Sequence, residues 1–101
     1  MPRATLALQV LPLNAPDAMA AVDAAIAVIQ DSGVSHEVGP METTIEGDSL
    51  RELLDVAARA HDAAVTLAGG PVQTNIRMIE SPAGIASMHE KTAPFREETS
   101  G

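Results

Sequence analysis

The sequence predicts an α+β fold: a ferredoxin-like βαββαβ sandwich in which a four-stranded antiparallel sheet carries two helices on one face. Three observations lead to this prediction. The 101 residues suffice for one domain with a modest hydrophobic core. Segments with the periodicity of strands and helices follow one another in the order βαββαβ. Right-handed crossovers leave few arrangements of these segments, and of these we favour the ferredoxin-like sandwich.

The first half of the pattern is a strand followed by a helix. Residues 5–11 alternate between larger apolar residues and smaller or polar ones, and Pro12 ends the strand because proline donates no ladder hydrogen bond. Asn14 and Asp17 supply start signals for a helix that runs to about residue 32, and Gly33 suits its C-terminal cap. The predicted buried stripe of this helix consists of Ala18, Val22, Ala25, Ile26 and Ile29.

A hairpin follows, and it contains the most polar stretch of the predicted sheet. Residues 34–38 and 41–46 are extended runs separated by the turn signal Gly39-Pro40. β-branched and polar residues alternate in the second run, which suits a strand with two unlike faces. If the protein binds a small molecule, we therefore expect this strand to hold it.

The second helix and the last strand complete the domain. A capping-box pattern at Ser49 and Glu52 begins the helix, which runs to about residue 67, and the last strand covers residues 72–79. Residues 1–80 thus form the ferredoxin-like domain. Residues 81–101 are a C-terminal extension, for which we expect a short helix around residues 86–92 and a mobile end. The predicted apolar stripe of the second helix consists of Leu50, Leu53, Leu54, Ala57, His61 and Ala64.

Composition and charge argue against several classes of function. The net charge of −8 disfavours nucleic acids and anionic membranes as partners, because both require basic patches, and it favours a cationic ligand. The chain has no cysteine, so it has neither a disulfide framework nor a thiolate metal site. We find no run long enough to span a membrane and no signal-peptide pattern, so we expect a cytoplasmic protein.

Candidate catalytic and metal-binding residues are few. His36, His61 and His89 have no second ligand at helical spacing, so no metal site is predicted. His61 lies on the apolar stripe, where it is either a core histidine with a hydrogen-bond partner or a polar group of a ligand pocket. Glu42 and Glu46 share one face of a strand, which is typical of solvated sheet faces and, less commonly, of acid–base pairs.

Alternation along the strands assigns side chains to the two faces of the sheet. If Leu8 and Val10 face the helices, Thr43, Ile45, Thr74 and Ile76 do so too. The buried hydroxyls among them then need partners from the backbone, water or a ligand. The opposite face could meet water or a second subunit, and the two exposed sheet edges could pair in a homo-oligomer. That face carries Gln9, Thr44, Glu46, Gln73, Asn75 and Arg77.

Five short segments, in order, resemble the small thiamine-binding proteins of the MTH1187/YkoF-like group. The most specific is Gly-Pro-Met-Glu-Thr-Thr-Ile-Glu-Gly-Asp at residues 39–48, which is similar to the family's Pro-Met-Gly-Thr-x-Ile-Glu-Gly run. Here Glu42 stands where the family usually has glycine. The resemblance covers roughly residues 4–80. The other segments are Gln9-Val10-Leu11-Pro12-Leu13, Ser32-Gly33 with the strand at 36–38, Ala60-His61 and Thr74-Asn75-Ile76-Arg77.

The resemblance implies a ferredoxin-like, homo-oligomeric (dimeric or tetrameric) protein that binds thiamine or its hydroxymethylpyrimidine moiety and is not an enzyme. We expect no cofactor and no metal. An acidic chain suits a cationic vitamin, and amide and hydroxyl groups could recognise an aminopyrimidine edge. Thr43 and His61 favour a pocket on the helix side, whereas Gln9, Glu46 and Asn75 favour the open side. The candidate ligand-binding residues are Gln9, Met41, Thr43, Thr44, Glu46, His61 and Asn75.

Two alternative functions stay open. The first is an oligomeric interaction or regulatory domain of the same fold that contacts other proteins through Gln73, Asn75 and Arg77. The second is a small cofactorless enzyme, in which His61 would be the base in a closed apolar cavity.

Overall fold

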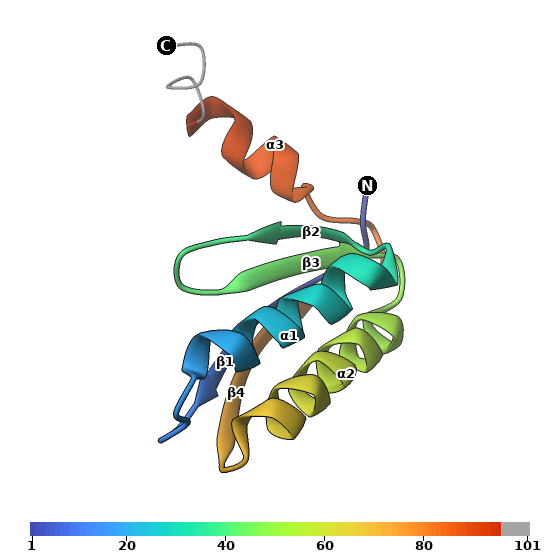
Figure 1. Ribbon diagram of the computed structural model, residues 1–101. Coiled ribbons are helices and arrows are strands. Elements are labelled where there is room, and N and C mark those ends of the chain that lie inside the picture. Colours follow the sequence, from blue (N-terminus) through green and yellow to red (C-terminus); the bar gives the residue numbers. More distant parts are fainter. Residues whose placement is uncertain (96–101) are drawn as a thin grey trace.

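The computed structural model describes residues 1–95 and confirms the predicted sandwich (Figure 1). The strands are antiparallel in the order β2-β3-β1-β4, and the two long helices cover one face of the sheet. None of the helices in this part of the chain is long and apolar enough to cross a membrane. The elements of the sandwich are β1 (Ala4–Pro12), α1 (Ala18–Ser32), β2 (Ser35–Val38), β3 (Thr43–Gly47), α2 (Leu50–Ala68) and β4 (Val72–Glu80).

The caps of both long helices form where the sequence predicts. The Asp17 carboxylate accepts a hydrogen bond from the backbone N–H of Ala20 at 3.0 Å, and the Ser49 hydroxyl accepts one from Glu52 at 3.2 Å. These bonds satisfy backbone donors that a helix leaves free at its N-terminus. Gly33 ends α1 with a φ of 79°, a left-handed conformation that glycine adopts without steric cost.

Cross-strand pairing confirms the predicted helix-facing side chains of the sheet. Leu8 pairs with Thr43 of β3 and with Ile76 of β4, and Val10 pairs with Thr74. Directly paired residues point to the same face of a sheet. Because Leu8 belongs to the core beneath the helices, its partners face the helices as well.

The buried stripes of the helices differ in part from the prediction. In α1, Val22 and Ile26 are half-buried and Ala18 is exposed, whereas Ala21 and Ala25 are buried. The reason is that α1 packs closely against α2 as well as against the sheet, and small residues allow this close approach. The buried residues of α2 are Leu53, Val56, Ala57, Ala60, Ala64 and Ala68.

The loop between β2 and β3 is longer than predicted. Met41 and Glu42 belong to this loop, because the backbone N–H of Gly39 donates a hydrogen bond to the Glu42 carbonyl at 2.9 Å and closes it. β3 therefore begins at Thr43, opposite Leu8 of β1. Beyond that pair, β1 continues alongside β4 to its end without a partner on its other side.

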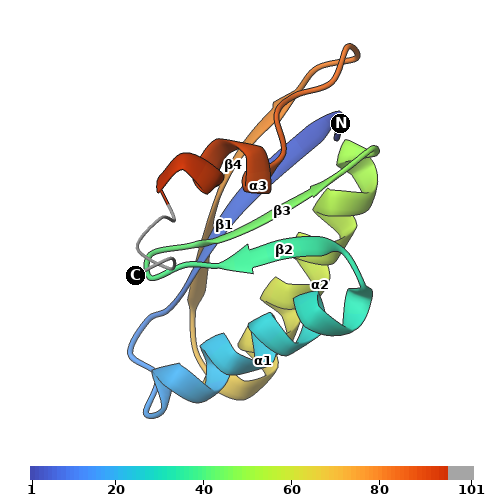
Figure 2. The same ribbon diagram turned by 90° about the horizontal axis from the view of Figure 1, so that it is seen from above.

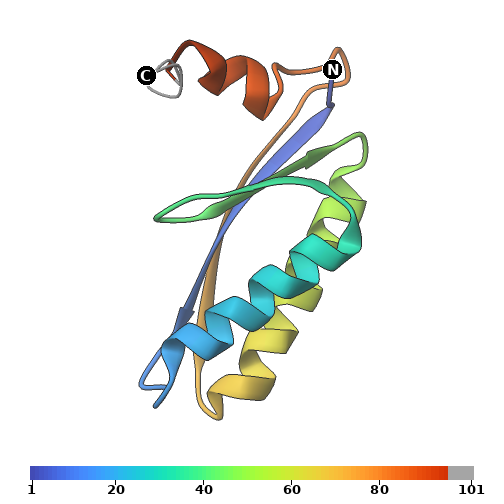
Figure 3. The same ribbon diagram turned by 45° about the horizontal axis from the view of Figure 1, so that its top comes forward.

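After β4 the chain crosses to the sheet face opposite α1 and α2, where α3 (Met88–Thr92) lies (Figures 1 and 3). The view from above shows α3 lying over the sheet (Figure 2). The backbone N–H of Met88 donates a hydrogen bond to Oε1 of Glu46 at 2.7 Å, and the Met88 side chain is buried. This helix therefore covers part of the face predicted to be open. The end expected to be mobile lies outside the described residues.

A candidate ligand-binding cavity

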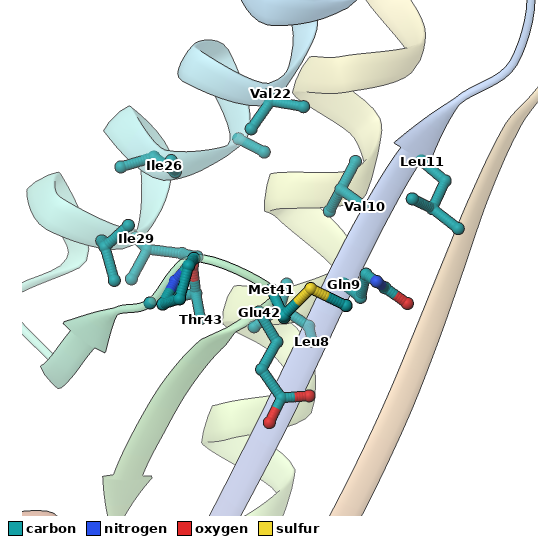
Figure 4. Close-up of a pocket in the computed structure, with 14 residues that line it drawn as sticks. Leu8, Gln9, Val10, Leu11, Val22, Ile26, Ile29, Met41, Glu42 and Thr43 are labelled. Carbon is teal, nitrogen blue, oxygen red and sulfur yellow. The ribbon is translucent and has the colours of Figure 1, made fainter.

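A cavity of about 260 Å³ opens where β3 parts from β1 (Figure 4). Its walls come from the second half of β1, from α1 and from the loop between β2 and β3. The gap exists because Leu8 is the last β1 residue that pairs with β3, while the pairing of β1 with β4 continues to Pro12. The split gives access to the layer between α1 and the sheet.

Aliphatic side chains form the inner wall of the cavity. Val10 of β1 and Val22, Ile26 and Ile29 of α1 surround it in Figure 4. Such a lining suits a flat, largely apolar ring better than a strongly hydrated group. It also explains why Val22 and Ile26 are half-buried, since both border the cavity.

Thr43 places a hydroxyl within this apolar lining. The residue is 7% exposed and faces the helices from the first position of β3. Among residues 1–95, its hydroxyl has no hydrogen-bonding partner. A hydroxyl in a mostly apolar lining is stabilised when a bound group gives it a hydrogen-bond partner. Thr43 can therefore bind a ligand group that donates or accepts a hydrogen bond.

The rim of the cavity carries polar groups from the sheet face opposite α1 and α2. Oε1 of Gln9 accepts a hydrogen bond from Nδ2 of Asn75 at 3.2 Å. Nη2 of Arg77 lies 2.6 Å from Oε1 and 2.5 Å from Oε2 of Glu42. Met41, which is 72% exposed, lies in the loop at the rim. The cavity thus joins an apolar interior to a polar, charged rim.

The structure brings some of the predicted contact residues together and separates others. Three of them line the cavity: Gln9, Met41 and Thr43. Asn75 reaches it through its hydrogen bond to Gln9. Thr44 and Glu46 lie on the opposite sheet face outside the lining, and Glu46 accepts the hydrogen bond from α3. The cavity therefore touches both sides of the sheet at its split edge.

His61 belongs to a different groove, between α2 and β4. Its Nδ1 lies 2.6 Å from Oγ1 of Thr74, so the predicted hydrogen-bond partner is present. Its predicted place in the buried stripe is wrong, because α2 turns Ala60 and Ala64 inward and leaves His61 half-buried at its edge. Within residues 1–95, no group of three or more histidines or carboxylates could hold a metal ion.

Periodicity alone does not identify the aliphatic lining or the partner of Glu42. Val10, Val22 and Ile26 have the spacing of core positions, and nothing in that spacing shows that a neighbouring strand ends beside them. Glu42 and Arg77 are separated by 35 positions in the chain. The available signal is Glu42 itself, which stands where the resembled family usually has glycine.

Comparison with known families decides the assignment. The family model described as thiamine-binding protein matches residues 6–96. The chain belongs to this family. A UPF0045 protein of Clostridium perfringens is 31% identical over 97 residues, which span 95% of this chain and 100% of that protein. The relationship to thiamine-binding proteins inferred from short segments is thereby confirmed.

Solved structures similar to this thiamine-binding family member share its fold. A domain of unknown function, DUF77, from Bacillus cereus is 40% identical with a TM-score of 0.84, and the match covers 96% of this chain and 93% of that one. A Thermotoga maritima protein, whose name suggests a place in thiamine biosynthesis or salvage, is 26% identical with a TM-score of 0.79. That match covers 94% of this chain and 100% of the other.

Proposed function

We propose that this protein is a non-catalytic binding module for thiamine or its hydroxymethylpyrimidine moiety. The observation that carries the proposal is the cavity at the split between β1 and β3, an aliphatic pocket with the unpartnered Thr43 hydroxyl in its lining. Family membership supplies the class of ligand. The chemistry of the cavity matches that class, because an aminopyrimidine is a flat ring with polar groups at its edge.

The size of the cavity favours one ring over two. Pockets that enclose whole drug-sized ligands have volumes of about 300–1,000 Å³. The cavity measures about 260 Å³, so we place the pyrimidine ring inside it, against α1 and near Thr43. The cationic thiazolium ring of thiamine would then remain at the rim, beside Glu42. The net charge of −8 favours the approach of such a cation.

The titratable groups support binding rather than catalysis. Of the described residues that line the cavity, Glu42 alone has an ionisable side chain, and Arg77 holds its carboxylate. His61, the candidate base, lies in the separate groove beside Thr74. Within residues 1–95, the arrangement offers contacts for a bound ring, and the one carboxylate of the lining is paired with Arg77.

We further infer a homo-oligomer in the cytoplasm, with residues 1–80 as the binding domain and residues 81–101 as an extension. β4 supports the oligomer because it is an edge strand with free backbone groups along one side. Its side chains Ile76, Met78 and Ile79 are between 40% and 57% exposed. Such apolar exposure along a strand edge is typical of a surface that a second subunit covers.

Isothermal titration with thiamine and with hydroxymethylpyrimidine tests the binding function. We expect saturable binding by the wild type and a loss of about three- to tenfold in affinity for Thr43→Val, which removes one hydrogen-bonding group without changing side-chain shape. Thr44→Val is the matched control, because Thr44 is the next residue of β3 but does not line the cavity. Heats no larger than dilution with a folded wild type would favour the interaction domain instead.

A further inference from the structure

An ion pair crosses the outer surface of the sheet at the rim of the cavity. Glu42 lies in the loop between β2 and β3, and Arg77 lies on β4, so the pair passes over β1 between them. The Glu42 side chain is drawn pointing away from the aliphatic wall in Figure 4. The carboxylate therefore lies at the outer surface of the rim rather than inside the cavity.

The pair is accessible to solvent and therefore weak. The Arg77 side chain is 76% exposed and the Glu42 side chain 32% exposed. Exposed ion pairs contribute little because water and salt screen them. Both contacts to Glu42 come from one nitrogen, Nη2, and not from the two-nitrogen fork that makes arginine–carboxylate pairs strong. A second cation could therefore replace Arg77 at small cost.

Other polar groups near the cavity are already engaged. The Gln9 amide oxygen is bonded to Asn75, and the Glu46 carboxylate is bonded to the backbone of α3. Glu42 is thus the carboxylate at the rim that a ligand cation can reach by displacing one exposed side chain, that of Arg77.

We propose that the Glu42–Arg77 pair sets the charge preference of the cavity: a cationic ligand group exchanges with Arg77 on the Glu42 carboxylate as the ligand binds. This inference rests on the proposed function and specifies which residues distinguish a cationic ligand from a neutral one. Arg77 competes with the ligand cation, whereas Glu42 attracts it. A neutral ligand that fits inside the cavity leaves the pair intact.

Two ligands and two arginine variants test the exchange. Thiamine carries the cationic ring, and hydroxymethylpyrimidine lacks it. Arg77→Gln is compared with Arg59→Gln, which changes the net charge equally but breaks an exposed pair with Asp55 on α2, away from the cavity. Titration at low salt should show thiamine binding strengthened about two- to fivefold by Arg77→Gln, the size expected for an exposed pair. Hydroxymethylpyrimidine should bind both variants like the wild type.

Glu42→Gln supplies the opposite change. It should weaken thiamine binding by about two- to fivefold and leave the binding of hydroxymethylpyrimidine unchanged. These effects should shrink as salt is added.

Weaker thiamine binding by Arg77→Gln, or equal gains in Arg77→Gln and Arg59→Gln, would overturn the exchange while leaving the binding function in place. The absence of binding of both compounds to the folded wild type would overturn the proposed function and this inference together.

Discussion

The two halves of β1 direct apolar side chains to the same helix-covered face of the sheet but have different surroundings. In the first half, Ala4 and Leu6 are fully buried, because β3 and β4 flank the strand on both sides. In the second half, β3 is absent, and Val10 is half-buried beside the cavity. The difference shows that the end of a neighbouring strand can open a cavity beside apolar positions that alternation alone would assign to the core.

Truncation of one side chain in each half gives the largest expected effect. Leu6→Ala should lower the free energy of unfolding by about 2–5 kcal/mol, because it leaves a void in a closed core. Val10→Ala should cost about 1 kcal/mol, since its side chain is half-buried and borders existing space. Urea denaturation measures both. Equal losses would show that the second half of β1 is as closely packed as the first.

Filling the cavity should separate binding from stability. Val22→Phe places a larger ring in the space, so thiamine and hydroxymethylpyrimidine should each bind at least about tenfold more weakly, while the free energy of unfolding changes by no more than about 1 kcal/mol. Val65→Phe on the exposed surface of α2 is the matched control and should bind like the wild type. Unimpaired binding by Val22→Phe would place the ligand elsewhere.

The smallest expected effect concerns α3, which lies on the sheet face opposite α1 and α2. Two hydrogen bonds lower the pKa of the Glu90 carboxyl. The larger effect comes from the backbone N–H of Ser87, and the smaller from the Ser87 hydroxyl. The capping box therefore stabilises α3 fully at pH values above the ordinary pKa of glutamate. This stabilisation is lost as the pH falls through the lowered pKa of Glu90. Carboxyl ¹³C titration by NMR should show the low midpoint, and Ser87→Ala should raise it. An identical midpoint in Ser87→Ala would show that the hydroxyl does not contribute.

The elements of the fold follow from local signals in the sequence. Alternation identified the strands, and short-range chemistry at Asp17, Ser49 and Gly33 fixed the ends of the helices. Such signals involve residues within a few positions of one another, which is why sequence reasoning detects them. The shared face of Leu8 and Thr43 could also be predicted. Once the side chains of one strand are assigned to the two faces of the sheet, alternation assigns those of the neighbouring strands.

The candidate site depends on features that no local pattern contains. The hydrogen bond between Gly39 and Glu42 closes the loop and sets the first residue of β3. The first residue of β3 in turn sets the point at which β3 separates from β1. The position of His61 depends on the orientation of α2 about its own axis, which is set by the packing of its alanines against α1. Helical periodicity does not determine this orientation closely enough to separate the buried stripe from its edge. Strand alternation therefore predicts correctly that Thr43 faces the helices, whereas helical periodicity assigns His61 to the wrong part of the α2 surface.

A methyl NMR titration with hydroxymethylpyrimidine tests the central claim most directly, because the cavity and the groove beside His61 have different methyl groups. We predict saturable shifts at Val10, Val22 and Ile26, which line the cavity, and unchanged signals at Leu54 and Ile76, which lie beside His61. Shifts confined to Leu54 and Ile76, or no shifts at saturating ligand, would contradict the assignment of the split between β1 and β3 as the binding site.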